Sequence, residues 1–394
     1  MSSSDEYDVA IIGAGIQGLG LAQACSLQGW KVAVVEKMPE PLTQTSSRST
    51  KLIHGGLRYL EQGKFALVRQ CLKERRLLCK LAPDLVRLQP FYLPVYKHSV
   101  RSFWCIALGL LCYWALAGFC RDGAFSVFWG KRAQKKASEA GLNCDRLSAL
   151  FIYNDAQTDD RALGLAVLKS AKALGAKLFF CTEVDRICKT EQGFELRGSA
   201  FNMRSRVVIN AAGPWVDRVH GALQPLPKAL NISKLAGSHV LFSLKADYRH
   251  CYLESPEDGR PVFVLPWQGK LLIGTTEKQL QDDGELETLA CSEQELHYLI
   301  AVHNYYFPAR SLSADELVAS FCGSRVLAAC KEKMHAAGRE HVVWHESDFG
   351  AYWAICGGKL TTYRLYAEQL LPALARALGY KASLRSTRTL FLQK

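Results

Sequence analysis

The amino-acid sequence predicts an α/β protein in which a Rossmann-like dinucleotide-binding domain is interleaved with an α+β domain built on an antiparallel sheet. A strand pattern, a glycine-rich turn and a second strand ending in an acid open the chain, at residues 7–12, 13–18 and 31–36. From about residue 222 the pattern changes to alternating, strand-like segments. A chain of 394 residues is too long for one small domain with a single core. Its length suits two domains, each assembled from separated segments of the sequence.

The glycine turn predicts a dinucleotide site. Gly13 permits the tight turn, Gly15 lets the backbone approach a pyrophosphate, and Gly18 lets the following helix pack closely on the strand. The N-terminus of that helix faces the phosphates. Glu36, at the end of the second strand, can accept hydrogen bonds from the adenosine ribose. These residues alone leave open whether the dinucleotide is NAD or FAD.

Residues 46–60 decide between the two dinucleotides. They read SSRSTKLIHGGLRYL, which crowds hydroxyls, cations, a histidine and paired glycines directly after the ribose-binding strand. Here the sequence closely resembles the FAD-dependent glycerol-3-phosphate dehydrogenases, within the D-amino-acid-oxidase-like flavoenzyme superfamily. Further matching blocks follow in the family's order, at 210–215, 237–239, 273–276 and 357–364.

The resemblance implies FAD, held in a glutathione-reductase-like domain of the D-amino-acid-oxidase type. The sequence contains no recognisable covalent flavin anchor and no metal-ligand spacing, so we expect noncovalent FAD and no metal. The positions expected to contact FAD are Gly13, Gly15, Ile16, Gln17, Gly18, Glu36, Lys37, Ser47, Ser49, Lys51, Leu52, His54, Gly55, Val184, Ala212, Gly213, Trp215, Gly358, Lys359, Leu360 and Thr361.

Two histidines in the matching blocks are candidate bases. Oxidising a secondary alcohol with flavin requires hydride delivery from carbon to the flavin and removal of the hydroxyl proton by a base. His54 and His239 both stand at family motif positions. Their positions support proximity to the flavin but do not separate the base from an orienting group.

Cations in the matching blocks suit a phosphate substrate. A phosphate monoester carries close to two negative charges, and its burial requires paired cations. Arg58, Arg325 and Lys359 are the candidates, and Tyr59 could add a hydroxyl to the phosphate or to the substrate oxygen.

The implied reaction is the oxidation of sn-glycerol 3-phosphate to dihydroxyacetone phosphate, with electrons passed to a membrane quinone. Two alternatives stay open. One is an FAD oxidase or dehydrogenase of another small hydroxy acid or amine, and the other is a flavin-binding paralogue without turnover. The number of cations near the flavin separates a phosphate dianion from a single carboxylate.

An uncharged, apolar segment covers residues 102–120. Its length is near the roughly 20 residues that span a bilayer. A span would place the flanking domains on opposite sides of the membrane, although the N-terminal glycine turn and the C-terminal lysine turn must meet on one flavin. A buried helix and a monotopic surface that dips into lipid therefore remain. The resemblance favours a helix and peripheral attachment to the cytoplasmic membrane.

The remaining elements follow in order. Residues 161–173 have helical periodicity, 177–181, 184–189 and 194–197 resemble a small β-meander, and 206–210 return as a parallel strand. Strands are expected at 238–244, 261–267, 270–274, 317–325 and 352–356. Ser292 and Glu295 predict a capping box for a helix through Tyr306, and a final helix is expected to begin near Lys359.

The expected FAD-binding domain therefore comprises residues 1–90, 145–221 and 336–394, and the substrate domain comprises 91–144 and 222–335. Val326 stands where the family typically has proline. Long family members continue into a helical C-terminal domain, which we expect this chain to lack.

The formal charge of +12 favours an acidic partner. No nucleic-acid motif accompanies this charge, so we expect an anionic substrate or an anionic membrane surface, and the basic run 130–136 is either a lipid contact or a solvated surface. The fourteen cysteines include no Cys-x-x-Cys pair, which fits reduced thiols in the cytoplasm. A homodimeric state is left open.

Overall fold

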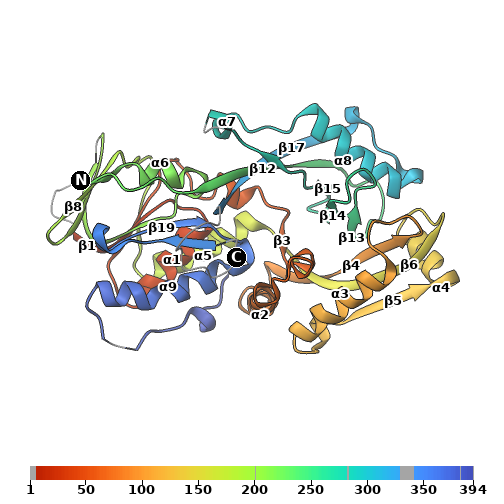
Figure 1. The fold of residues 1–394 in the computed structure, drawn as a ribbon, viewed down its shortest axis with the longest axis horizontal. Coiled ribbons are helices and arrows are strands. Elements are labelled where there is room, and N and C mark those ends of the chain that lie inside the picture. Colours follow the sequence, from red (N-terminus) through yellow and green to blue (C-terminus); the bar gives the residue numbers. More distant parts are fainter. Residues whose placement is uncertain (1–5, 200, 282–283, 329–340, 382, 394) are drawn as a thin grey trace.

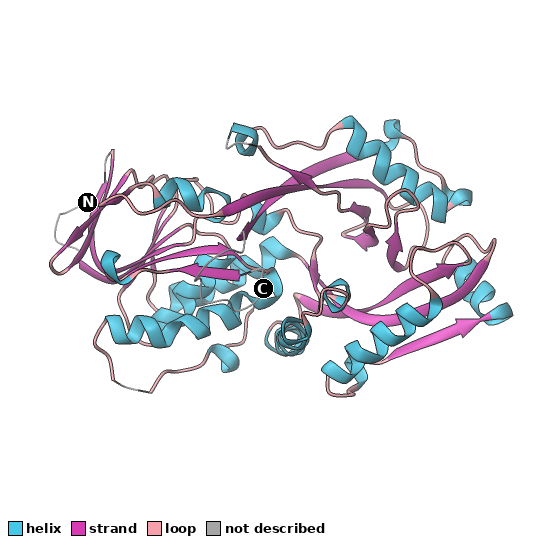
Figure 2. Cartoon of the chain, viewed as in Figure 1, coloured by secondary structure: helices cyan, strands magenta, loops and turns pink. Residues whose placement is uncertain are grey.

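The computed structural model describes residues 6–199, 201–281, 284–328, 341–381 and 383–393. These residues form two large β-sheets, one in the half of the molecule that holds the N-terminus and one in the other half (Figure 1). Helices accompany both sheets (Figure 2). The α/β class predicted from the sequence is confirmed.

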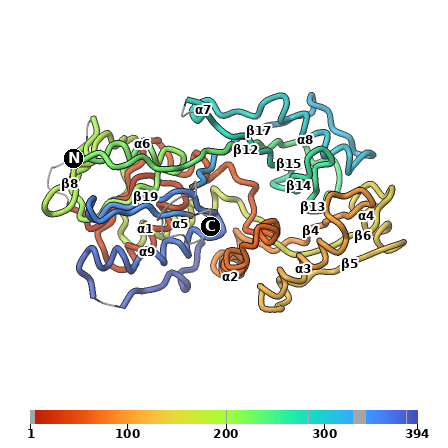
Figure 3. Tube along the Cα trace, viewed as in Figure 1, coloured from red at the N-terminus to blue at the C-terminus, as the bar shows by residue number. Residues whose placement is uncertain are grey.

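The first sheet has a parallel centre in the order β7-β2-β1-β10-β19, in which every neighbouring pair is parallel. Segments from the start, middle and end of the chain therefore lie side by side (Figure 3). These strands are β1 (Glu6–Ile12), β2 (Val32–Val35), β7 (Lys177–Phe179), β10 (Phe201–Asn210) and β19 (Tyr352–Gly357). Helices α1 (Ile16–Leu27), α5 (Asp160–Ala173) and α9 (Tyr363–Ala377) share a core with this sheet. All four residues of β2 are buried, which explains why its sequence is continuously apolar.

The predicted meander is confirmed in part. β8 (Arg186–Thr190) and β9 (Gly193–Gly198) pair antiparallel with each other, and β9 pairs antiparallel with β10. Short strands β11 (Leu223–Gln224) and β18 (His341–Trp344) extend the same sheet. The assignment of 177–181 to the meander is wrong, because α5 packs against α1 and returns the chain to the open edge of β2, where β7 pairs in parallel.

The second sheet is mainly antiparallel, as predicted. Its order is β16-β12-β15-β14-β13-β4-β6-β3, with β17 beside β12 and β5 beside β6. Its strands are β3 (Leu52–Ile53), β4 (Val86–Tyr96), β5 (Phe125–Trp129), β6 (Leu147–Thr158), β12 (Ile232–Ser243), β13 (His250–Glu254), β14 (Pro261–Trp267), β15 (Lys270–Gly274), β16 (Lys278–Gln279) and β17 (Leu317–Ala328). The predicted bounds of β14 and β15 are confirmed.

Helices cover both faces of the second sheet. Alternate residues of β12 face opposite cores: Leu241 packs with α2 (Phe65–Leu81) and α3 (Phe103–Leu116), whereas Val240 packs with α4 (Gly130–Glu139) and α8 (Glu293–Tyr306). The capping box of α8 is confirmed, since the Ser292 hydroxyl accepts from Glu295 N and the Glu295 carboxylate accepts from Ser292 N. Two short helices, α6 (Val216–His220) and α7 (Gly284–Glu287), complete the described helices.

Helix α3 carries an apolar face that the fold leaves bare. Ile106, Leu110 and Tyr113 are buried, whereas Trp104 is 78% exposed and Leu108 is 68% exposed. The segment is thus a helix, as predicted, but not a fully buried one. No helix among the described residues combines the length and apolarity needed to cross a bilayer.

The domain ranges remain a proposal, and the sheets depart from them at β6 and β4. β6 pairs with β4 along nearly its whole length, so residues 147–158 belong to the second sheet although the predicted range 145–221 assigns them to the FAD-binding domain. β4 itself begins at Val86, inside the predicted range 1–90. The predicted boundary between residues 335 and 336 lies outside the described residues.

The final helix begins later than the sequence predicts. Gly357 and Gly358 both have positive φ, and Lys359 is extended with φ −117° and ψ 151°. A 3-10 turn at Leu360–Thr362 then precedes α9, which begins at Tyr363. The glycine pair therefore separates β19 from the helix by an additional turn.

A buried ion pair joins α9 to α2. Arg364 donates to both oxygens of Glu74, at 2.9 and 2.6 Å, and the two side chains are 2% and 4% exposed. Glu368 supplies a second carboxylate at 2.8 Å from Arg364. The pair therefore links α9, which packs on the first sheet, to α2, which packs on the second.

Replacing Glu74 with glutamine is expected to lower the free energy of unfolding by about 3 kcal/mol, because the buried charge of Arg364 loses one of its two carboxylates. Chemical denaturation measures the change. The matched control is Glu40→Gln, since Glu40 pairs with Arg161 at the surface, where both side chains are exposed; its change should stay within about 1 kcal/mol. Equal losses in the two variants would contradict the assignment.

Candidate functional site

The turn between β1 and α1 brings three backbone segments into contact. Gly13 has φ +106°, and a Cβ there would lie 2.6 Å from the Ala211 carbonyl oxygen. A Cβ on Gly18 would lie 2.0 Å from the Gly13 oxygen. Side chains are therefore excluded at the tight turn and where α1 packs on the turn, which are the requirements that the first and third glycines of a dinucleotide-binding turn meet.

Glu36 lies at the end of β2 beside this turn. Its Oε2 accepts a hydrogen bond from Ala14 N at 2.7 Å, and its Oε1 accepts one from Met38 N at 2.9 Å. Each carboxylate oxygen can accept a second bond, and Glu36 also lines a cleft. The backbone thus fixes the carboxylate while leaving acceptor capacity for a ribose.

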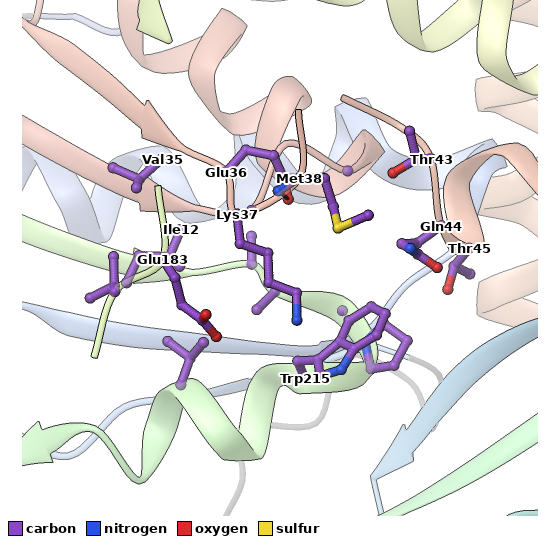
Figure 4. Close-up of a pocket in the computed structure, with 18 of the residues that line it drawn as sticks. Ile12, Val35, Glu36, Lys37, Met38, Thr43, Gln44, Thr45, Glu183 and Trp215 are labelled. Carbon is purple, nitrogen blue, oxygen red and sulfur yellow. Dashed lines mark hydrogen bonds between the residues drawn. The ribbon is translucent and has the colours of Figure 1, made fainter. Parts of the chain in front are cut away.

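This first cleft has a volume of about 880 Å³ and runs along the ends of β1, β2 and β10. Lys37 points toward Trp215 from the opposite wall, with Nζ 4.9 Å from the ring centroid (Figure 4). The predicted FAD contacts that line the first cleft are Gly13, Gly15, Glu36, Lys37, Val184, Ala212, Gly213 and Trp215.

A groove continues from the first cleft across the start of α1. The two share Gly15, Ser46 and Gly213 among their lining residues. Gln17 Nε2 donates to the Lys359 carbonyl at 3.2 Å, so the N-terminal glycine turn and the C-terminal lysine turn do meet. The predicted FAD contacts that line this connecting groove are Gly15, Ile16, Gln17, Ser49, Gly213, Gly358 and Leu360.

Other predicted FAD contacts lie behind the walls of these cavities. Lys51 is 4% exposed, and its Nζ donates to the Asp160 carboxylate at 2.8 Å and to the Ser47 carbonyl at 2.6 Å. The side chain of Lys51 therefore supports the loop from inside. Gly18, Ser47, Lys51, Leu52, Gly55, Lys359 and Thr361 do not line the described clefts.

A second cleft, of about 860 Å³, contains most of the predicted catalytic residues. His54, Arg58, Tyr59 and Arg325 line it, and Arg325 also lines the connecting groove. We call it the arginine cleft, because the arginines lining it among the described residues are Arg58, Arg260 and Arg325. The three cavities therefore lie next to one another, from the end of β2 to the arginines.

Contacts within the arginine cleft hold its cations. Arg325 pairs with the Glu277 carboxylate, and Arg260 Nη1 donates to the Glu277 carbonyl at 3.0 Å. The Nζ of Lys359 is buried and lies 3.4 Å from the centroid of the Tyr59 ring. Lys359 thus stands behind Tyr59 instead of lining the cleft itself.

His239 is brought close to the arginine cleft but does not line it. It is 3% exposed and stacks on Phe321, and its Nε2 lies 2.9 Å from the hydroxyl of Thr50, which does line the cleft. Burial, with a smaller effect of the Lys51 charge, lowers the pKa of His239 to about 3. A base is most effective when its pKa is near the working pH, so this geometry favours an orienting position for His239.

Sequence reasoning missed several residues of these cavities. Ser46 accepts a hydrogen bond from Ile16 N at 2.9 Å at the start of α1, and it stands inside the segment 46–60 that first indicated FAD. Thr50 stands in that segment too, and could have been inferred from it. Arg260 precedes β14 outside the matching blocks, so only the tertiary structure brings it to the cleft.

Known proteins are similar to this chain in sequence over most of its length. Residues 8–364 match the family model described as FAD dependent oxidoreductase. The chain is 34% identical to the glycerol-3-phosphate dehydrogenase of Synechocystis sp. over 93% of this chain and 69% of the relative. It is 32% identical to the aerobic glycerol-3-phosphate dehydrogenase of Escherichia coli over 93% of this chain and 73% of the relative. The chain belongs to the FAD-dependent glycerol-3-phosphate dehydrogenase family.

Solved structures agree with this family. The glycerol-3-phosphate dehydrogenase of Bacillus halodurans complexed with FAD gives a TM-score of 0.75 at 25% identity and covers 99% of this chain and 68% of that chain. The L-alpha-glycerophosphate oxidase of Mycoplasma pneumoniae, solved with FAD bound, gives a TM-score of 0.76 at 17% identity and shares the fold. The protein is an FAD-dependent oxidoreductase, and the glycine turn, Glu36 and the adjoining cavities fit that cofactor.

Replacing Gly13 with alanine is expected to abolish FAD retention, because the new Cβ collides with the Ala211 carbonyl where the backbone cannot move. The flavin-to-protein absorbance ratio of the purified protein measures this. Gly29→Ala is the matched control: Gly29 also has a positive φ, but its Cβ would meet no atom within 4 Å. Equal flavin contents in the two variants would contradict the steric argument.

The lowered pKa of His239 predicts a pH dependence of stability. The unfolded chain binds a proton on this histidine below about pH 6.5 and the folded chain does not, so the free energy of unfolding decreases as the pH falls from about 6.5 toward 3. His239→Gln should remove up to about 1.4 kcal/mol per pH unit from that slope. Denaturation at a series of pH values measures it, with the exposed His297→Gln as control; an unchanged slope in His239→Gln would refute the prediction.

Proposed function

We propose that the protein oxidises sn-glycerol 3-phosphate to dihydroxyacetone phosphate and passes the electrons to a membrane quinone. The observation that carries this proposal is the arginine cleft, where Arg58, Arg260 and Arg325 come from separate segments of the chain to one cavity with His54. The names of the relatives from Synechocystis sp. and Escherichia coli support the same substrate.

The charge of the arginine cleft supports a phosphate over a single carboxylate. Guanidinium groups match phosphate oxygens in bidentate geometry, and a dianion needs more than one of them. Arg260 and Arg325 are exposed and Arg58 is half-buried. The cations are therefore available to a ligand, and a phosphate that binds Arg325 takes the place of the Glu277 carboxylate.

We assign separate roles in the reaction to the residues in and behind the arginine cleft. Bound FAD supplies a hydride acceptor. His54 lines the cleft together with the arginines and is our candidate for the base that takes the hydroxyl proton. Thr50 joins this wall to His239, which we assign an orienting position. Tyr59, with Lys359 behind its ring, closes the wall beside the phosphate cations.

We further propose peripheral attachment to the cytoplasmic membrane through α3. Its bare apolar face presents Trp104, Leu108 and Leu111 to solvent. Lys131, Arg132 and Lys135 of α4 are exposed, but α4 packs on the opposite face of the second sheet, so these cations are not part of this contact. An exposed apolar helix face binds at the boundary between lipid headgroups and acyl chains. Attachment there would bring the flavoprotein to a quinone acceptor in the same bilayer.

Anaerobic mixing of the purified holoprotein with glycerol 3-phosphate is expected to bleach the oxidised flavin absorbance. Glycerol and lactate, which lack the phosphate, should leave the flavin oxidised. Bleaching by lactate or an amine but not by the phosphate would refute the proposed substrate and favour another member of the fold.

Arg325→Ala is expected to raise the glycerol 3-phosphate concentration for half-maximal bleaching about tenfold, or about 1.4 kcal/mol. The effect is smaller than for a buried pair, because the Arg325 side chain is 46% exposed. Arg249→Ala is the matched control, since Arg249 is an exposed arginine directly before β13 of the same sheet and does not line the cleft. An unchanged half-maximal concentration would remove Arg325 from the phosphate site.

Replacing Trp104 and Leu108 together with glutamate is expected to abolish sedimentation of the holoprotein with vesicles of phosphatidylcholine and phosphatidylglycerol. The change places charges on the apolar face without touching a buried side chain. The control is Leu226→Glu, which alters a leucine that is 74% exposed outside α3. Undiminished sedimentation of the double variant would refute α3 as the lipid contact.

A further inference from the structure

One carboxylate oxygen of Asp155 collects three donors from three segments of the chain. Asp155 lies on β6, is 3% exposed and lines the arginine cleft. Its Oδ1 accepts from Arg75 Nη1 at 2.7 Å, from the Tyr113 hydroxyl at 2.7 Å and from Gly55 N at 3.1 Å. Helix α2, helix α3 and the loop after β3 therefore meet at one atom.

Arg75 holds this oxygen in place and balances its charge. The Arg75 side chain is completely buried, and it also donates to the Asn154 carbonyl at 2.6 Å and to the Asp122 carbonyl at 2.8 Å. Both of these acceptors are backbone carbonyl oxygens, so the guanidinium is anchored to the main chain. The pair also neutralises a carboxylate that would otherwise repel a phosphate from the wall of the arginine cleft.

Gly55 is held against this cluster both by hydrogen bonds and by close packing. Its N–H is shared between Asp155 Oδ1 and the Tyr113 hydroxyl oxygen, which lies at 2.9 Å. A Cβ on Gly55 would lie 2.3 Å from that hydroxyl. His54 directly precedes Gly55, and Arg58 follows three residues later. The position of the loop that carries both groups is thus set from behind the cleft.

We propose that Asp155 and Tyr113, held by Arg75, are positioning residues that fix the loop of residues 54–59 in the geometry used for substrate oxidation. They act through Gly55, and the proposal rests on the proposed function for the identity of the reaction. Asp155 and Tyr113 both accept a hydrogen bond from Gly55 N, and they are buried, so water does not compete for these bonds. Buried bonds of this kind can hold the loop in one position that its own residues would not maintain.

Tyr113→Phe tests this proposal, because it removes the hydroxyl and keeps the ring in the core. We expect faster hydrogen–deuterium exchange in peptides covering residues 52–60, and at least a tenfold fall in the limiting rate of flavin bleaching at saturating glycerol 3-phosphate. The matched control is Tyr306→Phe, which removes a buried hydroxyl that donates to the Glu254 carbonyl at 2.7 Å in the other core of the second sheet. Its exchange over residues 52–60 and its limiting rate should equal those of the wild type.

Asp155→Asn is the second variant, since asparagine keeps an acceptor for Gly55 N while removing the charge that pairs with Arg75. Faster exchange at residues 52–60 in Tyr113→Phe, without a matching change in Tyr306→Phe, supports the proposal, and faster exchange in Asp155→Asn as well assigns the same role to the charge of the carboxylate. Wild-type exchange at residues 52–60 in Tyr113→Phe, or equal losses of rate in Tyr113→Phe and Tyr306→Phe, overturns it. Exchange is measured on the holoprotein without substrate, so a wild type that glycerol 3-phosphate does not bleach would refute the proposed function and still leave the positioning result readable.

Discussion

The backbone contact at the glycine turn is the constraint on which the rest of the structure depends. A Cβ at Gly13 or Gly18 would lie within 2.6 Å of a carbonyl oxygen, so β1, α1 and the end of β10 can meet only without side chains. That contact aligns the carboxyl ends of the parallel strands along one edge. The first cleft and the connecting groove both follow this edge, and the groove leads to the arginine cleft.

Two groups of arginines in this protein serve different purposes. Arg75 and Arg364 are completely or almost completely buried, and each is paired with carboxylates; Arg75 joins α2 to β6, and Arg364 joins α9 to α2. Arg58, Arg260 and Arg325 keep solvent contact at a cavity wall. Because Arg75 and Arg364 are buried, a ligand cannot reach them. The three arginines of the cleft keep a positive charge that is accessible to a phosphate. The same residue type therefore supports the fold in one place and a binding surface in another.

Predictions from sequence succeeded where one local pattern carries the physical requirement. The glycine turn, the α8 capping box and the strands β14 and β15 depend on neighbouring residues, and the structure has them as predicted. Predictions fell short where the outcome depends on distant partners. The Lys51 amino group turns inward to Asp160, and β7 joins β2 instead of the meander. Neither partner is visible from the segment itself.

The sequence by itself determined that this protein is an FAD-dependent oxidoreductase. The glycine turn of the dinucleotide site and the family blocks each consist of contiguous residues, so they can be recognised without the structure. The sequence also named His54, Arg58, Tyr59 and Arg325 as candidates, and in the structure these four residues line one cleft. Only the tertiary structure decided that His239 is buried behind that wall, that Arg260 joins the cleft, and that one face of α3 stays bare. The burial of a residue and the compensation of its charge depend on side chains from many segments of the chain. Those side chains come together only when the two sheets have packed against each other.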